Sequence, residues 1–393
     1  MDRAENALLD YFRAGIKSPL QPFRIGTEIE HFVAYTDTRR TLPYSDVADI
    51  LRSLVPKYPR EVSEGGKIIG CARKDAALSL EPGAQLELSV EPKAAIREIE
   101  DTYIGFLRDT APLLGDHDAE LVCAGYSPKN TAAETDMIPK VRYRFMDEHF
   151  ARIGPMGRRM MRCTASCQYS VDYTSEDDFV RKFRLAYALS PILALLSDNA
   201  PTYEGKPNRL PLRRTMIWRG VDPARAGIVP GVFDEGFGFE SYARFVLEAP
   251  AIFRRSGGAY ISAEGRSARD IMNGTPDEYL PEAAELYTSL VFPDIRLRGY
   301  IELRPMDSVP PERFLAMAAL VKGVFIGSER ATFAEGVTER SVAAAQDAIA
   351  NRGLSARVYN TTARALVRET IALAESNLPP DERRYLTPIS PSQ

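Results

Sequence analysis

The segment 24–35, RIGTEIEHFVAY, constrains the fold more than any other part of this sequence, because its polar and apolar residues alternate. Side chains two apart on a β-strand point to the same face, so Glu28 and Glu30 share one face, while Ile25 and Ile29 share the other. Neighbouring like charges disfavour joint ionisation, and a cation between them removes that conflict. Taken alone, the pattern fits a solvated strand face or a cation-binding site equally well.

Three further regions show the same polarity, each with an apolar back and a front of acids, amides or arginine. Their polar positions are Ser79 and Glu81 before the turn Pro82-Gly83-Ala84, Gln85 and Glu87 after it, Gln168 within 162–173, and Glu302 with Arg304 within 298–304. The turn residues predict that 77–81 and 85–90 form a hairpin. Together these strands predict one sheet with a concave polar face, which favours the cation-site interpretation of Glu28 and Glu30.

The rest of the chain reads mainly as helices and one long loop. Helical spacing is predicted for the segment up to Ala14 and for 44–55, 92–114, 176–196, 240–253, 315–325, 341–350 and 363–375. Residues 200–236 are rich in proline and glycine, and such a long loop is usually functional. Strands with helices between them, followed by helices alone, predict an α+β fold. We expect one domain over 1–393, with a helical C-terminal part at about 311–393.

Composition excludes several classes of function. The 393 residues carry a net charge of −4 with both signs interspersed, which argues against nucleic-acid binding. The sequence has no apolar run long enough to span a membrane and no signal-like N-terminus, so we expect a soluble cytoplasmic protein, either a monomer or a homodimer. Four scattered cysteines and three histidines favour neither a disulfide framework nor a structural zinc site.

The row of carboxylates suggests a particular kind of chemistry. Mg²⁺ prefers oxygen ligands and commonly binds a few carboxylates together with nucleotide phosphates. The sequence has no GxxxxGK[ST] motif, so a P-loop is excluded. Carboxylates on a sheet are an alternative means of holding Mg²⁺ and ATP phosphates, where the metal neutralises charge during phosphoryl transfer.

Several motifs resemble a known family, the plant and proteobacterial type of glutamate–cysteine ligase. They are RIGTEIEHF (24–32), SLEPGAQLELS (79–89), MMRCTASCQYSVDY (160–173), NAPTYEGKPN (199–208), IWRGVDPARAGIVP (217–230), FDEGFGFESY (233–242) and RLRGYIELRPMD (296–307). They occur in the family's order and cover roughly residues 22–330. SLEPG-QLELS followed by GFGFE is specific to the family.

The resemblance implies a glutamine synthetase-like fold, in which an antiparallel sheet curves around the active site and helices pack outside it. It implies that ATP and Mg²⁺ convert glutamate into γ-glutamyl phosphate, which the amine of cysteine attacks to give γ-glutamylcysteine, the first step of glutathione synthesis. The positions that match metal ligands are Glu28, Glu30, Glu81, Glu87, Gln168 and Glu302. Gln168 is a neutral ligand and an alternative candidate for orienting substrate.

The resemblance also assigns residues to the substrates. Arg162 and Arg214 match positions that bind substrate, and arginine holds carboxylates through two parallel hydrogen bonds. Arg304 and Arg225 are candidates for stabilising phosphate or transition-state charge. Trp218 and Tyr260 are candidates for walling the acceptor pocket, although single aromatic residues more often belong to a core.

The sequence departs from the family pattern at positions that bear on the acceptor. LRPMDSVPP after Glu302 replaces a glycine-rich run, and CTASCQYSVDY is altered around the family core. These changes alter the shape of the site near the substrates more than its ATP chemistry. A ligase that joins glutamate to a different amine is therefore an alternative, and a catalytically inactive binding homologue is a second. The retained acids and Arg304 argue against the inactive homologue.

Overall fold

The computed structural model describes residues 2–390, and its centre is one antiparallel sheet of nine strands. The strand order is β14-β15-β7-β1-β5-β4-β3-β2, and β6 also pairs with β1. The strands are β1 (Ile25–Tyr35), β2 (Arg60–Glu64), β3 (Lys67–Ala72), β4 (Ala76–Leu80), β5 (Leu86–Lys93), β6 (Ala119–Val122), β7 (Ser166–Val171), β14 (Ile295–Leu297) and β15 (Ile301–Asp307). The predicted strands lie side by side in this sheet, as the α+β prediction required.

The strand register brings the predicted polar faces together. Glu28 on β1 pairs with Gln168 on β7, and Glu30 pairs with Glu87 on β5. Glu302 on β15 pairs with Ser170 on β7, so its side chain joins the same row. The turn between β4 and β5 ends at Ala84, whose φ of 63° is unusual for a residue with a Cβ atom.

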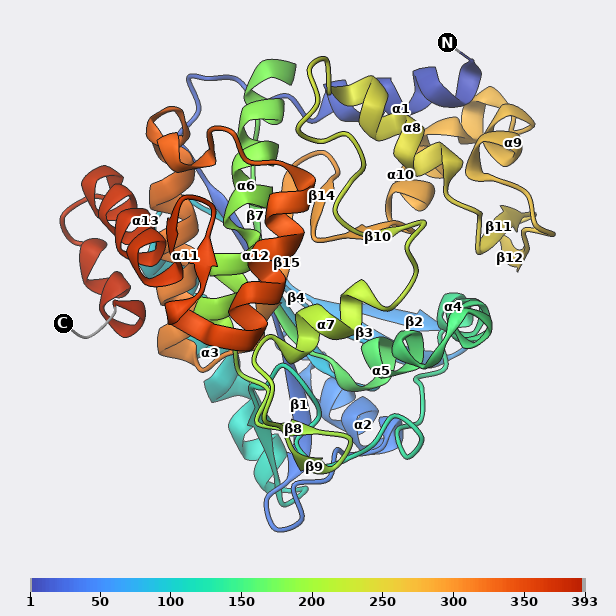
Figure 1. The fold of residues 1–393 in the computed structure, drawn as a ribbon. Helices are drawn as coiled ribbons and strands as arrows, with labels where there is room; N and C mark the ends of the chain where they lie inside the picture. Colours follow the sequence, from blue (N-terminus) through green and yellow to red (C-terminus); the bar gives the residue numbers. More distant parts are fainter. Residues whose placement is uncertain (1, 391–393) are drawn as a thin grey trace.

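Helices cover the apolar back of the sheet. They include α2 (Tyr44–Leu54), α3 (Ile96–Gly115), α6 (Glu176–Ser197) and α11 (Pro311–Ile326), and Figure 1 shows α3, α6 and α11 gathered on one side of the molecule. On this back, His31 makes hydrogen bonds through its two ring nitrogens to Tyr103 Oη, at 2.8 Å, and to the Leu86 carbonyl, at 3.2 Å. Burial lowers the pKa of His31 to about 4, so it is a neutral core residue.

The C-terminal region is helical, as the sequence predicts. It contains α11, α12 (Glu339–Arg352) and α13 (Ala363–Asn377), and Figure 1 shows α13 outside α11. The segment after α13 is held against α11 and the start of α3. Lys322 of α11 and the backbone N–H of Ile96, the first residue of α3, both donate hydrogen bonds to Glu382 in this segment. Most of the buried apolar residues, from Ala4 to Ile389, form one hydrophobic cluster, and two small clusters lie apart from it.

The remaining elements lie around the polar face, at the rim and, for the last two short strands, against α12 and α13. They are α1 (Arg3–Ala14), α4 (Val141–Ile153), α5 (Pro155–Cys163), α7 (Arg213–Arg219), α8 (Phe239–Glu248), α9 (Ala268–Asn273), α10 (Leu280–Thr288), and the short strands β8 (Thr202–Tyr203), β9 (Lys206–Pro207), β10 (Ala226–Gly227), β11 (Phe253–Ser256), β12 (Ala259–Ser262), β13 (Phe292–Pro293), β16 (Arg357–Val358) and β17 (Thr361–Thr362). None of the helices within residues 2–390 is long and apolar enough to cross a membrane.

Two predicted strands have different boundaries in the structure. Residues 162–173 were expected to be all strand, but Arg162 and Cys163 end α5, and β7 begins at Ser166. A proline in the first turn of α5 favours helix there. The strand predicted over 298–304 is instead the turn and second strand of the β14–β15 hairpin, and Arg298 lies in its turn.

Candidate active site

A cavity of about 270 Å³ lies on the polar face of the sheet. Its floor is formed by side chains of β1, β4–β5, β7 and β15, and its walls come from α4, α5, α7 and the segment 289–298. The charged and amide residues that line it are Glu28, Glu30, Glu81, Gln85, Glu87, Gln168 and Glu302, together with Lys140, Arg142, Arg214, Arg296, Arg298 and Arg304. Acids on the floor therefore face cations on the walls.

Three carboxylates on the floor have raised pKa values. Burial and the nearby Glu302 charge raise the pKa of Glu28 to about 7. Burial and Glu81 raise the pKa of Glu30 to about 7, against the hydrogen bonds that Glu30 accepts. Burial and the neighbouring acids hold the pKa of Glu87 well above its usual range. Burial, helped by the neighbouring acids, disfavours the charged form of these three carboxylates, so the floor favours a bound proton or cation.

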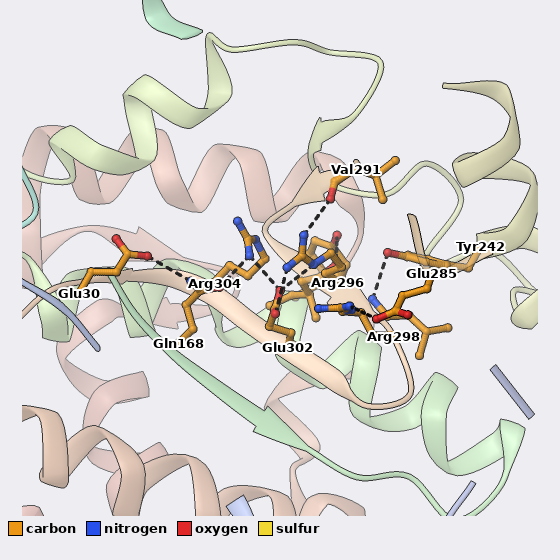
Figure 2. Close-up of polar contacts among 12 residues, drawn as sticks. Glu30, Gln168, Tyr242, Glu285, Val291, Arg296, Arg298, Glu302 and Arg304 are labelled. Carbon is orange, nitrogen blue, oxygen red and sulfur yellow. Dashed lines mark hydrogen bonds and ion pairs between the residues drawn. The ribbon is translucent and has the colours of Figure 1, made fainter. Parts of the chain in front are cut away.

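Glu30 is held in place by the next strand. The backbone N–H and the hydroxyl of Ser166 donate to its two carboxylate oxygens at 2.8 and 2.7 Å. Gln168 Nε2 donates to Glu30 at 3.3 Å, while Gln168 Oε1 accepts from Arg304 at 2.7 Å. Figure 2 shows this link from Glu30 through Gln168 to Arg304. The amide oxygen expected to bind a metal is therefore used to orient an arginine.

Glu302 lies between two arginines. Arg296 donates to both of its carboxylate oxygens, at 2.7 and 3.0 Å, and Arg304 donates to one at 2.9 Å (Figure 2). Burial opposes ionisation, but these two guanidinium groups lower the pKa of Glu302 to about 2. Glu302 is therefore ionised and fully paired in this structure, and a metal would have to displace an arginine to bind it.

Trp218 supports two of the arginines that face the acids. The guanidinium carbons of Arg214 and Arg304 lie 5.5 and 5.4 Å from its ring centroid. Arg214 also donates to the backbone carbonyl of Arg304 at 2.9 Å. Burial lowers the pKa of Arg214, and its Nε has no hydrogen-bond partner among the described residues. The indole thus positions two cations, one of which keeps donors for an incoming anion.

The acids on the floor fit a hard cation by their chemistry. Among residues 2–390, no three His, Cys, Asp or Glu side chains gather closely enough to form a complete metal centre. Mg²⁺ does not need such a centre, because it usually takes one or two carboxylates and completes its shell with water and phosphate oxygens. Glu28 is the candidate ligand whose carboxylate is least engaged, since no described residue donates a hydrogen bond to it.

Three residues expected at the site lie outside the cavity. Arg162 pairs with Asp147 at 2.9 Å and donates to backbone carbonyls of the 132–135 loop. Arg225 is 1% exposed and donates to Asp222 and to the carbonyls of Leu290 and Pro250, which joins three segments. Tyr260 packs on Phe253 in the β11–β12 hairpin. These placements correct the expectation that the three side chains face the same site as the acids.

The cavity is also lined by four cations and a tyrosine that are not among the predicted site residues: Lys140, Arg142, Arg296, Arg298 and Tyr143. Lys140, Arg142 and Tyr143 reach it from the start of α4, where no periodic signal marks them. Arg296 and Arg298 continue the alternation of the β14–β15 hairpin backward from Glu302. Their spacing of two was the signal that could have identified them, because it places both on the face of Glu302.

Comparisons with known proteins agree with this architecture. The model of glutamate-cysteine ligase family 2 matches residues 24–389. Chloroplastic glutamate–cysteine ligases of Solanum lycopersicum and Nicotiana tabacum are each 35% identical over 323 residues, which is 81% of this chain and 62% of theirs. Ligase B of Oryza sativa subsp. japonica is 33% identical over 82% of this chain and 66% of its own length. The chain thus spans about 62% of the first two relatives' length.

A solved structure shows the same fold. Glutamate–cysteine ligase of Francisella tularensis, in complex with AMP, superposes with a TM-score of 0.57 at 12% identity and covers 94% of this chain and 81% of its own. The sequence motifs, the sheet with its acidic floor and the family match over 24–389 lead to one conclusion. The chain belongs to glutamate-cysteine ligase family 2.

Proposed function

We propose that this protein joins the γ-carboxylate of glutamate to the amine of cysteine at the expense of ATP, through γ-glutamyl phosphate, to give γ-glutamylcysteine. One observation carries the proposal: acids from β1, β4–β5 and β15 and the arginines on α7 and β14–β15 open onto a single cavity. The family match and the 35% identical ligases support the choice of substrates. The AMP held by the Francisella ligase supports a nucleotide substrate.

The chain's residues would act mainly by positioning and charge neutralisation. The Arg214 guanidinium, supported by Trp218, would bind a substrate carboxylate with its unpaired donors. Arg304, held by Gln168 and Glu302, would face the phosphoryl group and the charge that develops on it. No residue needs to form a covalent bond, because the substrate carboxylate itself attacks the γ-phosphate and the amine then displaces phosphate.

The acids on the floor would hold Mg²⁺ together with ATP. Glu28, Glu30, Glu81 and Glu87 are the residues whose oxygens fit this role, whereas Glu302 is already paired with two arginines. Mg²⁺ when bound would neutralise phosphate charge during transfer. The raised pKa values of Glu28 and Glu30 support this assignment, because burial and neighbouring acids disfavour their charged forms and a bound cation would offset both effects.

A ligase that uses a different amine is the second candidate. The run after Glu302 departs from the family's glycine-rich sequence, and in the structure Pro305 interrupts the β15–β7 register between Leu303 and Met306. Pro305 also lines a small pocket with Arg214 and Trp218, next to the main cavity. A proline where the family has a glycine-rich sequence would change the shape of the cavity wall beside Arg214 and Trp218, and so would alter which acceptor amine fits there.

A single assay separates the candidates. Purified protein is incubated with Mg²⁺, ATP and glutamate, and ADP release is measured against a panel of amines. Cysteine-dependent release supports the proposed reaction, and preference for another amine supports the second candidate. If the folded protein binds ATP but releases no ADP with any amine, the ligase proposal is rejected.

A further inference from the structure

A second cavity, of about 620 Å³, lies at the rim of the molecule between the β11–β12 hairpin, α9 and α10. It shares no lining residue with the acidic cavity. Figure 1 shows the hairpin at the edge of the ribbon, away from the helices that cover the sheet. The hairpin turn contains Gly257 and Gly258, with φ of 56° and 80°, as a tight two-residue turn requires.

Two arginines in this cavity have hydrogen-bond donors that no described residue uses. Arg254 comes from β11 and Arg266 from the loop that precedes α9. Each has a buried Nε without a hydrogen-bond partner, and neither guanidinium forms an ion pair with any residue in 2–390. The one carboxylate that lines the cavity, Glu282, already pairs with Arg255 at 3.0 Å. Asp270 interacts electrostatically with Arg266 but forms no ion pair with it, so both partly buried cations keep donors available.

A tyrosine adds a third unused donor. Tyr287 of α10 is 3% exposed, lines the same cavity, and its hydroxyl has no hydrogen-bond partner among the described residues. Burial raises the pKa of Tyr287 to about 12, although Arg266 and Arg254 both oppose the rise, so the hydroxyl keeps its proton. Buried polar groups are normally hydrogen-bonded, and an unpaired one needs an explanation such as a ligand.

Backbone hydrogen bonds hold the segments that carry these groups. Arg254 pairs with Ile261 in the hairpin ladder. The carbonyl of Arg266 accepts from Ala251, and the next residue, Ser267, caps α9. The rest of the lining combines apolar side chains, including Ile271 and Leu286, with the Arg255–Glu282 ion pair. A pocket with free cationic donors and partly apolar walls suits an anionic head group attached to an apolar body.

We propose that this cavity binds a small organic anion, whose carboxylate or phosphate group is held by Arg254, Arg266 and the hydroxyl of Tyr287. The site is separate from the acidic cavity and does not depend on the ligase reaction. The bound group would receive charge-assisted hydrogen bonds from two guanidinium groups, and arginine matches both carboxylate and phosphate geometry. The apolar walls would cover the rest of the molecule.

Calorimetry on the full chain, without ATP or glutamate, tests this site. The probes are n-butyl phosphate and butyrate, with n-butanol as the uncharged control. We expect saturable binding of at least one anion and none of butanol. Arg254→Gln and Arg266→Gln should each weaken that binding at least about tenfold, and Tyr287→Phe should weaken it less. Arg269→Gln is the matched control, because Arg269 pairs with Asp2 outside this cavity.

Circular dichroism verifies that each variant is folded. If Arg254→Gln fails to fold, Arg254→Lys takes its place, because lysine keeps the charge but loses the two-pronged geometry and should still weaken binding. The anion that binds with the higher affinity, n-butyl phosphate or butyrate, identifies the preferred head group. Absence of binding by both anions, equal binding of butanol, or unchanged affinity in the Arg254 and Arg266 variants would each overturn the proposal.

Discussion

Glu30 and Glu87 stand directly opposite each other on β1 and β5, where cross-strand side chains are close neighbours. Both line the acidic cavity, and the pKa of each is raised by burial and by neighbouring acids. Like charges in this position destabilise a sheet, so the pair opposes folding unless a proton or a cation accompanies it. The stability of the protein without Mg²⁺ and ATP should therefore depend on whether these two acids are protonated, and binding of Mg²⁺ should stabilise the folded state.

Removing the charge of Glu28 should abolish turnover without unfolding the protein. Glu28→Gln keeps the size of the side chain but loses a candidate Mg²⁺ ligand, so we expect kcat to fall at least about 100-fold. Glu91→Gln changes an exposed acid of β5 that does not line the cavity; its turnover should stay within about twofold of wild type, so it is the control. ADP release under saturating ATP measures both. Near-normal turnover in folded Glu28→Gln protein would remove Glu28 from the metal site.

The empty protein should lose stability as pH rises from about 5 to 7. The pKa of Glu28 and Glu30 is about 7 when folded and near 4.5 when unfolded, so the folded state binds more protons in this window. The sign of proton linkage then makes the free energy of unfolding decrease with rising pH, by roughly 1–3 kcal/mol per group. Urea unfolding at several pH values measures the slope.

The Glu28→Gln variant measures how much Glu28 contributes to this dependence of stability on pH. Glu28→Gln cannot titrate, so its stability should depend less steeply on pH than that of the wild type, and it should be the more stable protein at pH 8. A slope equal to that of the wild type would show that Glu28 does not change its protonation on unfolding, contrary to the raised pKa.

Binding of Mg²⁺ with ATP should release protons at pH 6.5. The floor acids are partly protonated there, and metal ligands must be deprotonated to bind. Calorimetry in two buffers of different ionisation enthalpy gives the number of protons released per nucleotide. We expect release to fall toward zero at pH 8.5 and to be smaller in Glu28→Gln. Equal heats in both buffers at pH 6.5 would contradict a metal site on these acids.

Alternation was sufficient to predict the strands that carry the acidic floor, but not the edge strands β2 and β14. Glu28, Glu30, Glu87 and Glu302 each follow the two-residue period of a strand, and the apolar residues behind them fix which face is buried. The pairing order of the strands was not predictable, because register depends on contacts between segments far apart in the sequence. The cations at the start of α4 were missed for the same reason.

The arginines were harder to assign than the acids. An arginine has a long flexible side chain, so its position in the sequence does not reveal which carboxylate or carbonyl it meets. Arg214 and Arg304 reach the cavity, whereas Arg225 points into the protein and is held by Asp222 and two carbonyl oxygens. Only the tertiary packing distinguishes these outcomes.

Arg225 should therefore matter for stability more than for chemistry. Its pairing with Asp222, at 2.7 Å, is nearly inaccessible to solvent, and Arg225→Met would leave a buried carboxylate with fewer partners. Breaking a buried pair costs about 3–5 kcal/mol, so the midpoint of thermal unfolding should fall by several degrees. Arg219→Gln, which breaks the more exposed pair with Asp347, should cost less than about 1 kcal/mol.

Turnover per folded Arg225→Met molecule, measured well below its unfolding midpoint, should stay within a few-fold of wild type. A large loss of kcat at unchanged stability would instead return Arg225 to the catalytic groups.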